Sequence, residues 1–374
     1  NNKEYLKFLT YRTSRENVNL IDRFFNWGKF DYLNCINRYP KFKKKFKISG
    51  GIRFEICDQN ILNKIYQGDI LKLKKIYKKK HILITTSHLT SKKEIKNYMN
   101  SDETFMKIKN KTEKNLRYKE LVSLYELNLE FRNLIKSLAK NFKDIPIVIR
   151  PHPSENLNDW KEFINKYFYG KENIYINVKQ DLNSVIRNSL CVINSKSSSG
   201  LHAFFQNIPI ISFIPKKVKY RKRVFDYMGS EANNINEVIK FVSLIKDNKK
   251  LNKTKKKSYK LLSNNIYNFV KNNNSSKIIL KEVDKIYKNK SEINKLLIIF
   301  LSPLYKVSDF IFKILKIRYH SEKLSSSAIR LSKEKLHDGI NKYEIKNFFQ
   351  NLGISKNINI ISFGKNCFFI YRKN

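Results

Sequence analysis

The sequence contains few cysteines, and they are widely separated. The four are Cys35, Cys57, Cys191 and Cys367, and no two of them form a CxxC pair. This spacing argues against a disulfide framework and against a structural zinc site, so we expect a reducing, cytoplasmic setting and no bound metal. No apolar run reaches the roughly 18 residues that a membrane span needs, and no signal-peptide pattern opens the sequence. Neither export nor membrane insertion is expected.

Acidic residues are also scarce. The 374 residues include 76 Lys plus Arg against 32 Asp plus Glu, which gives a net charge of +44. A hydrophobic fraction of 41% supplies a sizeable core, so the chain is not a disordered polyelectrolyte. Biased composition explains the interleaved lysines; the alternative is attraction to nucleic acid, an acidic membrane face or a phosphorylated substrate. Nucleic acid is disfavoured because no zinc finger, KH loop or RNP signature is present.

Hydrophobic periodicity divides the chain into three regions. Residues 1–80 show helical spacing over residues 14–26, a second helix ending near Pro40, a short strand and a Gly-Gly turn, and a helix over residues 61–79. In residues 81–288, apolar strands alternate with helices. This pattern is typical of a parallel sheet covered on both faces and predicts an α/β, Rossmann-like domain.

Residues 289–374 form a smaller appendage. They include the apolar segment 296–317, which either packs against the body of the protein or lies as an interfacial helix on a membrane. A helix over residues 342–352 and a hairpin with Gly364 in its turn follow, so a small α+β segment is expected.

Polar residues follow several of the predicted strands. Ligands of open parallel sheets bind beyond the carboxyl ends of the strands, so these residues are the candidates for a site. They are Thr86, Ser87, Arg150, His152, Ser195, Ser197, Ser198, Ser199 and Gly200. The serine-rich segment precedes a helix, and its hydroxyls and free backbone N–H groups at the positive end of the helix dipole suit a phosphate or diphosphate. Ordinary capping of the helix is the alternative.

Two prolines, Pro151 and Pro153, bracket His152 directly after the second strand. Because proline restricts its own backbone and that of the residue before it, Arg150 and His152 are expected to remain at the sheet edge. A guanidinium and an imidazole in that position could neutralise a departing phosphate. They are the candidate catalytic residues.

Six segments resemble, in order and spacing, the bacterial surface carbohydrate biosynthesis protein family. They are "LIDRFFNWG", "YP", "ISGGIRFEI", "HILITTSHL", "IVIRPHPSE" and "NSKSSSGLHAFFQNIPIISFIP". That family is similar to GT-B glycosyltransferases of capsule and lipopolysaccharide assembly, including Kdo transferases, and more distantly to wall-teichoic glycerophosphotransferases. The resemblance implies a GT-B-like fold and metal-independent transfer of a sugar from a nucleotide donor, CMP- or UDP-linked, to a polysaccharide or lipid-linked acceptor. It implies no separate cofactor.

The resemblance also implies roles for individual residues. The donor phosphates would lie between the serine-rich segment and Arg150 with His152. Arg53 matches the arginine of a family turn, although the Asn-Pro of that turn is replaced here. His202 stands where many GT-B enzymes have the glutamate that holds the donor ribose. By the same comparison, residues 1–80 would be the end of an N-terminal acceptor-side domain whose beginning is absent.

Three alternatives remain open from the sequence. The first is transfer of a polyol phosphate from a CDP-linked donor, which uses a similar sheet edge. The second is a non-catalytic scaffold of the same pathway, suggested by His202 in place of the glutamate. The third is RNA binding on charge alone. The positive charge would also favour peripheral contact with the anionic inner face of the cell membrane.

Overall fold

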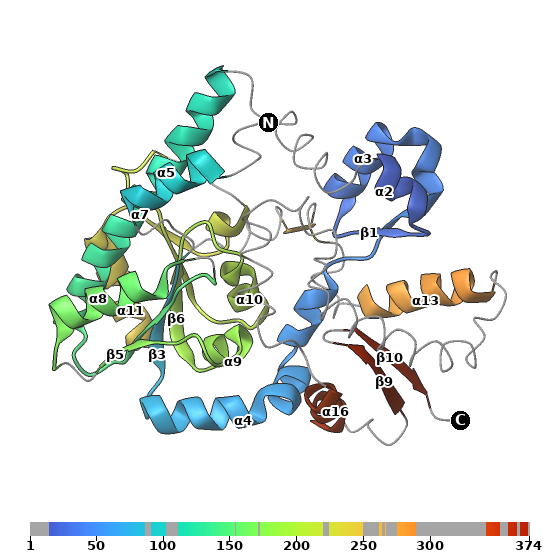
Figure 1. The fold of residues 1–374 in the computed structure, drawn as a ribbon. Coiled ribbons are helices and arrows are strands. Elements are labelled where there is room, and N and C mark those ends of the chain that lie inside the picture. Colours follow the sequence, from blue (N-terminus) through green and yellow to red (C-terminus); the bar gives the residue numbers. More distant parts are fainter. Residues whose placement is uncertain are drawn as a thin grey trace, which may run out of the picture. The chain divides into compact units, whose positions relative to one another are not determined.

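The chain separates into two compact units, each described here by itself. The computed structural model describes residues 15–86, 91–101, 111–153, 155–170, 173–219, 224–249, 262–263, 266, 275–288, 342–351, 358–364 and 367–372. Described residues of 1–61 and 254–295 form the first unit, and those of 62–253 and 296–374 form the second. Figure 1 shows the elements of both units. The segment 275–288, which the sequence pattern assigned to the sheet domain, lies in the first unit.

The first unit is built around a short parallel pair of strands. Its elements are α2 (Arg15–Leu20), β1 (Phe24–Asn26), α3 (Lys29–Arg38), η1 (Pro40–Lys45), β2 (Phe46–Ile48), η2 (Ile52–Cys57) and α13 (Ser275–Lys288). The prediction of one helix over residues 14–26 is wrong in its second half, because Phe24 pairs with Phe46 across β1 and β2 and their rings pack edge to face at 5.7 Å. Tertiary pairing overrides the helical spacing there.

Acidic side chains hold the helices of this unit. The Glu55 carboxylate accepts a 2.8 Å hydrogen bond from the backbone N–H of Ser276 in the first turn of α13. Arg23 donates to Glu282 of the same helix at 3.1 Å. The Gly-Gly turn before η2 is confirmed: Gly50 has φ 88°, and a Cβ on Gly51 would lie 2.6 Å from the ring of Phe54. Only glycine fits both positions.

The second unit contains a six-stranded parallel sheet with the order β5-β4-β3-β6-β7-β8. Its strands are β3 (His81–Thr85), β4 (Ile147–Arg150), β5 (Ile174–Ile176), β6 (Ser189–Asn194), β7 (Ile210–Phe213) and β8 (Ser230–Ala232). Its helices are α4 (Gln59–Tyr77), which begins in the first unit, α5 (Lys92–Ser101), α7 (Lys111–Asn141), α8 (Leu157–Phe168), α9 (Leu182–Arg187), α10 (Ser199–Phe205) and α11 (Ile235–Lys246), with η3 (Val224–Tyr227). The α/β class and the parallel sheet are confirmed.

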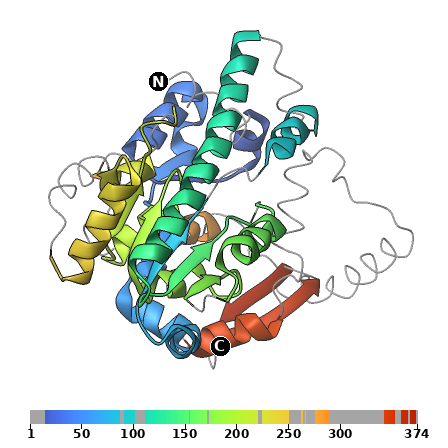
Figure 2. The same ribbon diagram turned by 90° about the vertical axis from the view of Figure 1, so that its left-hand side faces the viewer.

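Helices cover both faces of this sheet. Ile82 and Ile84 of β3 are fully buried in a cluster that includes Phe131 of α7, Trp160 of α8 and Val238 of α11. In Figure 2, α7 crosses the sheet between α8 and α11. The alternate residues of β3 point to the opposite face, where Thr85 contacts α10. Strands buried on both faces explain why the sequence shows continuous apolar runs there.

The C-terminal elements follow the prediction. Helix α16 (Lys342–Asn351) is followed by β9 (Ile358–Gly364) and β10 (Cys367–Arg372), which pair antiparallel. Gly364, which was expected in the turn, is instead the last residue of β9, where it is paired with Cys367. The apolar segment 296–317 and Ser87 lie outside the described residues. Among the residues that the structure describes, no helix is long and apolar enough to cross a membrane.

His81, at the start of β3, is a fully buried histidine. Among the described residues neither ring nitrogen has a partner at full hydrogen-bond geometry, and the ring of Tyr77 packs against the imidazole edge to face at 4.9 Å. Burial lowers the pKa of His81 to about 3, against the weaker opposing effect of the Val185 backbone. The imidazole is therefore neutral in the folded protein at neutral pH.

We expect this histidine to make the protein sensitive to acid. Because the pKa of His81 is lower in the folded chain than in the unfolded chain, the unfolded chain binds more protons between about pH 6.5 and pH 3. As the pH is lowered through this window, the free energy of unfolding should therefore fall by up to about 1.4 kcal/mol per pH unit. His81→Phe should remove this contribution, measured by urea denaturation at several pH values. The control His152→Gln should retain it; an unchanged slope in His81→Phe would contradict the assignment.

Candidate functional site

The carboxyl ends of neighbouring strands bring most of the predicted site residues to one edge of the sheet. Thr85 of β3 is aligned with Arg150 of β4 on one side and with Asn194 of β6 on the other. Asn194 is in turn aligned with Ser212 of β7. Since adjacent strands are about 4.8 Å apart, the backbones at Arg150 and Asn194 are separated by roughly 10 Å. The segment after β6 and the segment after β4 therefore begin on either side of Thr85.

A chain of hydroxyl groups leads from β3 to the serine-rich segment. Ser199 donates its hydroxyl proton to Ser197 Oγ at 2.8 Å, and the hydroxyls of Ser199 and Thr85 are 2.6 Å apart. Because Ser199 has one hydroxyl proton, Thr85 must be the donor in the second bond. Among the described residues, the proton of Ser197 is then left without an acceptor. Ser197 is partly exposed, so this proton can be donated to a ligand.

Three backbone donors at the start of α10, those of Ser199, Gly200 and Leu201, are used inside the protein, contrary to the prediction of free N–H groups there. The N–H of Ser199 donates to Ser197 Oγ at 3.3 Å. The N–H of Gly200 donates to the carbonyl of Ser197 at 3.3 Å, and the N–H of Leu201 donates to the carbonyl of Ser198 at 3.0 Å. These short-range bonds form because the chain turns into α10 directly after Ser197. Of the predicted serines, Ser197 and Ser198 are partly exposed, whereas Ser195 is buried.

The Arg150 guanidinium is held toward β5. Its Nη1 donates to Asn177 Oδ1 at 2.9 Å and to the carbonyl of Gln180 at 2.5 Å. Asn177 also donates to the Tyr77 hydroxyl at 2.9 Å, which ties α4 to the same group. Burial lowers the pKa of Arg150, and Asp181 opposes this effect. Arginine stays charged despite such a shift, so a fixed positive charge lies at this edge.

A carboxylate that the sequence analysis did not single out fixes the segment after β4. Glu155 Oε2 accepts hydrogen bonds from Thr86 Oγ1 and from Trp160 Nε1, both at 2.8 Å. The backbone N–H of Glu155 donates to the carbonyl of His152 at 2.8 Å. The Thr86 hydroxyl thus donates its proton inside the protein, and its contact with substrate stays a prediction. His152 is partly exposed on the segment that Glu155 holds.

The resemblance placed His202 where other enzymes contact the donor ribose. In this structure the side chain is instead engaged inside the protein. It is buried in α10, with Nδ1 2.8 Å from Asn183 Oδ1 of α9. It therefore joins two helices on one face of the sheet. Arg53 is an exposed residue of the first unit, with its guanidinium 5.6 Å from the centre of the Phe54 ring.

Lys196 is a second residue that the prediction left out of the site. It has φ 54°, a conformation that favours glycine, although its side chain is buried. The backbone N–H of Lys196 donates to Asp226 Oδ1 at 2.7 Å, and Lys196 Nζ lies 3.7 Å from Glu120 Oε1 of α7. The strained backbone and the buried ammonium set the path from β6 to α10. A lysine among many lysines gives no sequence signal for this role.

No metal site is apparent in the part of the chain that the structure describes. There, no group of three or more His, Cys, Asp or Glu side chains could hold an ion. The chemistry available at the edge is that of hydroxyl donors, an imidazole and a fixed guanidinium. Such groups suit an anion.

Comparisons with known proteins give structural neighbours of low identity. No protein-family model matches the chain, and no curated protein sequence matches it. Similar solved structures include a Listeria monocytogenes protein described as a UDP-N-acetylglucosamine 2-epimerase, with 12% identity over 77% of this chain and 66% of that chain (TM-score 0.45). The wall teichoic acid polymerase TagF has 15% identity over 73% of this chain and 60% of that chain (TM-score 0.45). The structure of S. aureus MnaA with UDP has 15% identity over 77% of this chain and 67% of that chain (TM-score 0.43).

The chain spans less than two thirds of the Listeria protein and of TagF, at 66% and 60% of their lengths.

We expect Glu155 to stabilise the second unit. Glu155→Ala leaves Thr86 and Trp160 without their shared acceptor, and hydrogen bonds to a charged group contribute about 1.5–3 kcal/mol each. The free energy of unfolding should fall by about 3 kcal/mol, and by less in Glu155→Gln, which keeps an acceptor oxygen. The measurement is urea denaturation followed by fluorescence in a Trp27→Phe background, where Trp160 is the remaining tryptophan. The control is Glu162→Ala, at an exposed position of α8; equal losses in both variants would refute the role of Glu155.

Proposed function

We propose that this chain binds the phosphates of a nucleotide-activated sugar at the carboxyl edge of its sheet and transfers the sugar during surface polysaccharide assembly. The proposed fold type is GT-B, and the proposed reaction needs no metal ion. The sequence resemblance supports this reading, and so does the convergence of hydroxyl and cationic groups at one edge. The acceptor would be a polysaccharide or a lipid-linked precursor.

The hydroxyl chain from Thr85 through Ser199 to Ser197 is the observation that carries the proposal. Ser199 accepts from Thr85 and donates to Ser197, whose oxygen also accepts from the N–H of Ser199, and these bonds polarise the terminal O–H group of Ser197. A phosphate oxygen is the strong acceptor that such a donor suits. The neighbouring hydroxyl of Ser198 is partly exposed and would add a second donor.

His152 and Arg150 have different proposed roles. His152 lies on the segment that Glu155 anchors, so a phosphate held by Ser197 could receive a hydrogen bond from its imidazole as negative charge develops on the leaving group. Arg150 would act from a fixed position, since two hydrogen bonds hold its Nη1. Within the described part of the chain its other N–H groups make no hydrogen bond, so they would be the donors to the ligand. Its charge would lower the energy of the departing nucleotide.

The donor contact to the ribose must come from elsewhere in this proposal. His202 is engaged by Asn183 inside the second unit, so in this proposal His202 does not take the role of the family glutamate. The nucleotide is therefore defined here by its phosphates, with CMP and UDP as the candidate carriers. CDP-linked polyol phosphates present the same anionic groups to Ser197 and are the second substrate class.

We expect Ser197 to determine phosphate affinity. Ser197→Ala should weaken the binding of CMP, CDP or UDP by about tenfold to a hundredfold, the equivalent of one hydrogen bond to a charged group. His152→Ala should weaken it as well. Isothermal titration calorimetry on the full chain gives the dissociation constants, and Ser137→Ala on α7, away from the edge, is the matched control. Equal affinities in all four proteins would rule out the site.

Product analysis separates the two substrate classes. Incubation with a CMP- or UDP-linked sugar, or with CDP-glycerol, followed by mass spectrometry of the acceptor, distinguishes a gained sugar from a gained polyol phosphate. Nucleotide binding without either product would favour the non-catalytic role.

A further inference from the structure

The opposite, amino edge of the same sheet has a concentrated positive charge. The end of α4 and the residues that lead into β3 contain six exposed lysines and no acidic residue: Lys72, Lys74, Lys75, Lys78, Lys79 and Lys80. The carboxyl edge also has exposed lysines, Lys216, Lys217 and Lys219 after β7, so the test below compares the two edges at equal charge.

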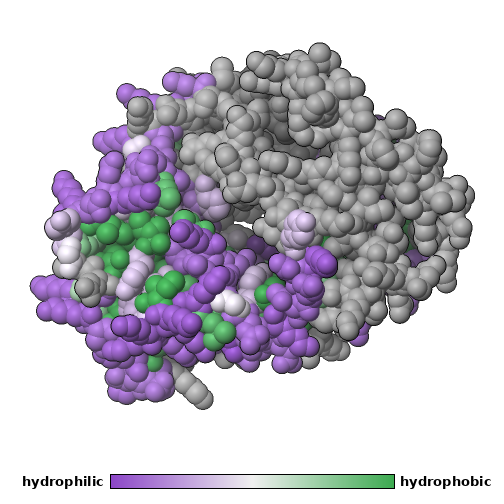
Figure 3. Space-filling model, turned by 60° about the horizontal axis from the view of Figure 1, so that its bottom comes forward, coloured by the Kyte–Doolittle hydropathy of each residue, from purple (hydrophilic) through white to green (hydrophobic). Residues whose placement is uncertain are grey.

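Apolar side chains are exposed among these lysines. Leu71 is 51% exposed and Ile76 is 49% exposed on α4. Figure 3 brings the side of the molecule with α4 forward, and its described surface is mostly hydrophilic with apolar side chains in separate patches. Half-exposed leucine and isoleucine between cations is the pattern of a surface that lies in a bilayer interface.

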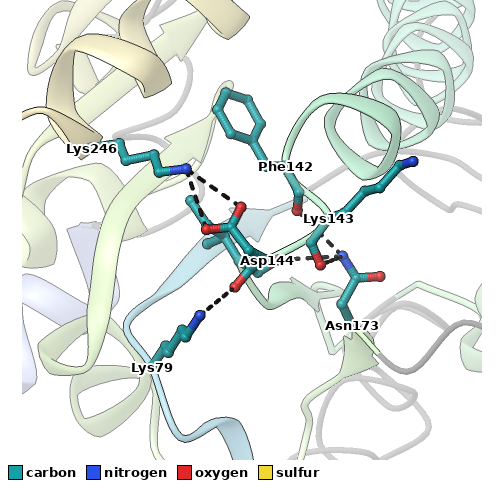
Figure 4. Close-up of polar contacts among 7 residues, drawn as sticks. Lys79, Phe142, Lys143, Asp144, Asn173 and Lys246 are labelled. Carbon is teal, nitrogen blue, oxygen red and sulfur yellow. Dashed lines mark hydrogen bonds and ion pairs between the residues drawn. The ribbon is translucent and has the colours of Figure 1, made fainter.

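The basic surface continues from α4 to the turn between α7 and β4. Lys79 Nζ donates to the carbonyl of Asp144 at 3.4 Å, and Lys246 Nζ lies 3.3 Å from a carboxylate oxygen of the same residue. On the other side of the turn, the Asn173 side-chain amide donates to the carbonyls of Phe142, Lys143 and Ile145 (Figure 4). The ends of α4, α7 and α11 are thus joined at one edge. Asp144 is the residue through which Lys79 and Lys246 meet, and Asp247 follows at the end of α11.

A hollow of about 590 Å³ lies beside this turn. It is lined by Lys136, Ala139, Lys140, Lys143, Tyr167, Phe168 and Asn173. Lys136 Nζ is 3.6 Å from the centre of the Tyr167 ring, and Tyr167 is 45% exposed. The hollow therefore has lysine ammonium groups at its rim and an aromatic wall. An amphipathic tyrosine beside lysines suits the headgroup region of a membrane.

We propose that the amino edge of this sheet is a docking surface for an anionic lipid bilayer. Clustered lysines on α4 and α7 would attract the headgroups, Leu71 and Ile76 would enter the interface, and the hollow would accept a phosphate headgroup between Lys140 and Lys143. The exposed aliphatic side chains of Leu71 and Ile76 favour a bilayer over RNA, because they offer bases no stacking surface. The proposal is independent of the transfer reaction, because it uses the edge opposite the nucleotide site.

Vesicle sedimentation with the full chain tests this surface. The protein should pellet with phosphatidylcholine vesicles that contain phosphatidylglycerol and remain in solution with pure phosphatidylcholine. The triple variant Lys72→Gln, Lys75→Gln and Lys140→Gln should lower the partition coefficient by about a hundredfold, from about fivefold per lysine. Leu71→Ser with Ile76→Ser should abolish the binding that remains at high salt, where electrostatic attraction is screened.

A matched triple variant separates this surface from total charge. Lys216→Gln, Lys217→Gln and Lys219→Gln remove the same charge from exposed positions after β7, at the opposite edge, and should leave vesicle binding nearly unchanged. Equal losses in the two triple variants would overturn the proposal, as would binding without preference for phosphatidylglycerol. Binding of a single-stranded RNA oligonucleotide that falls in the amino-edge variant, with vesicle binding unaffected, would assign the surface to nucleic acid instead.

Discussion

Parallel pairing of β3 with β4 and β6 is the constraint on which the candidate site depends. The alignment of Thr85 with both Arg150 and Asn194 sets two segments, far apart in the sequence, on either side of one threonine. In a parallel pair, a slip by one residue would turn the Thr85 hydroxyl to the face that carries the apolar cluster. The bond between Thr85 and Ser199 would then be impossible. Buried isoleucines at alternate positions enforce the register, so the core of the sheet specifies the geometry of its edge.

The sequence predicts the sheet well because its strands are continuous apolar runs separated by amphipathic helices. Each strand from β3 to β7 lies where the pattern indicates. The pattern does not reveal β8, since Ser-Glu-Ala has no apolar periodicity and becomes a strand only through pairing with β7. The same limit explains β1, where apolar spacing compatible with a helix is used in a strand pairing with β2. Short elements depend on partners that a local pattern does not contain.

The position of the site could be predicted from the sequence, but the roles of its side chains could not. That residues after the strands converge follows from parallel topology. Which of them faces a ligand depends on side-chain competition: Glu155 engages Thr86, Asn177 engages Arg150, and Asn183 engages His202. Glutamate and asparagine are common in polar loops, so none of these partners is conspicuous in the sequence. The hydroxyl of Ser197 is available because Ser199 is the donor to it, a direction that only the geometry reveals.

The Asn173 amide has a consequence for how this protein can change during evolution. The side-chain amide donates to three carbonyls after the end of α7. The backbone carbonyl of Asn173 accepts a 2.8 Å hydrogen bond from the N–H of Ile147 at the start of β4. One residue before β5 thus spans the whole connection between a helix and its following strand. Substitution of a side chain within that connection leaves these bonds to backbone groups in place, whereas insertion or deletion of a single residue would misalign both ends at once. Homologous chains should therefore vary in sequence but not in length at this turn.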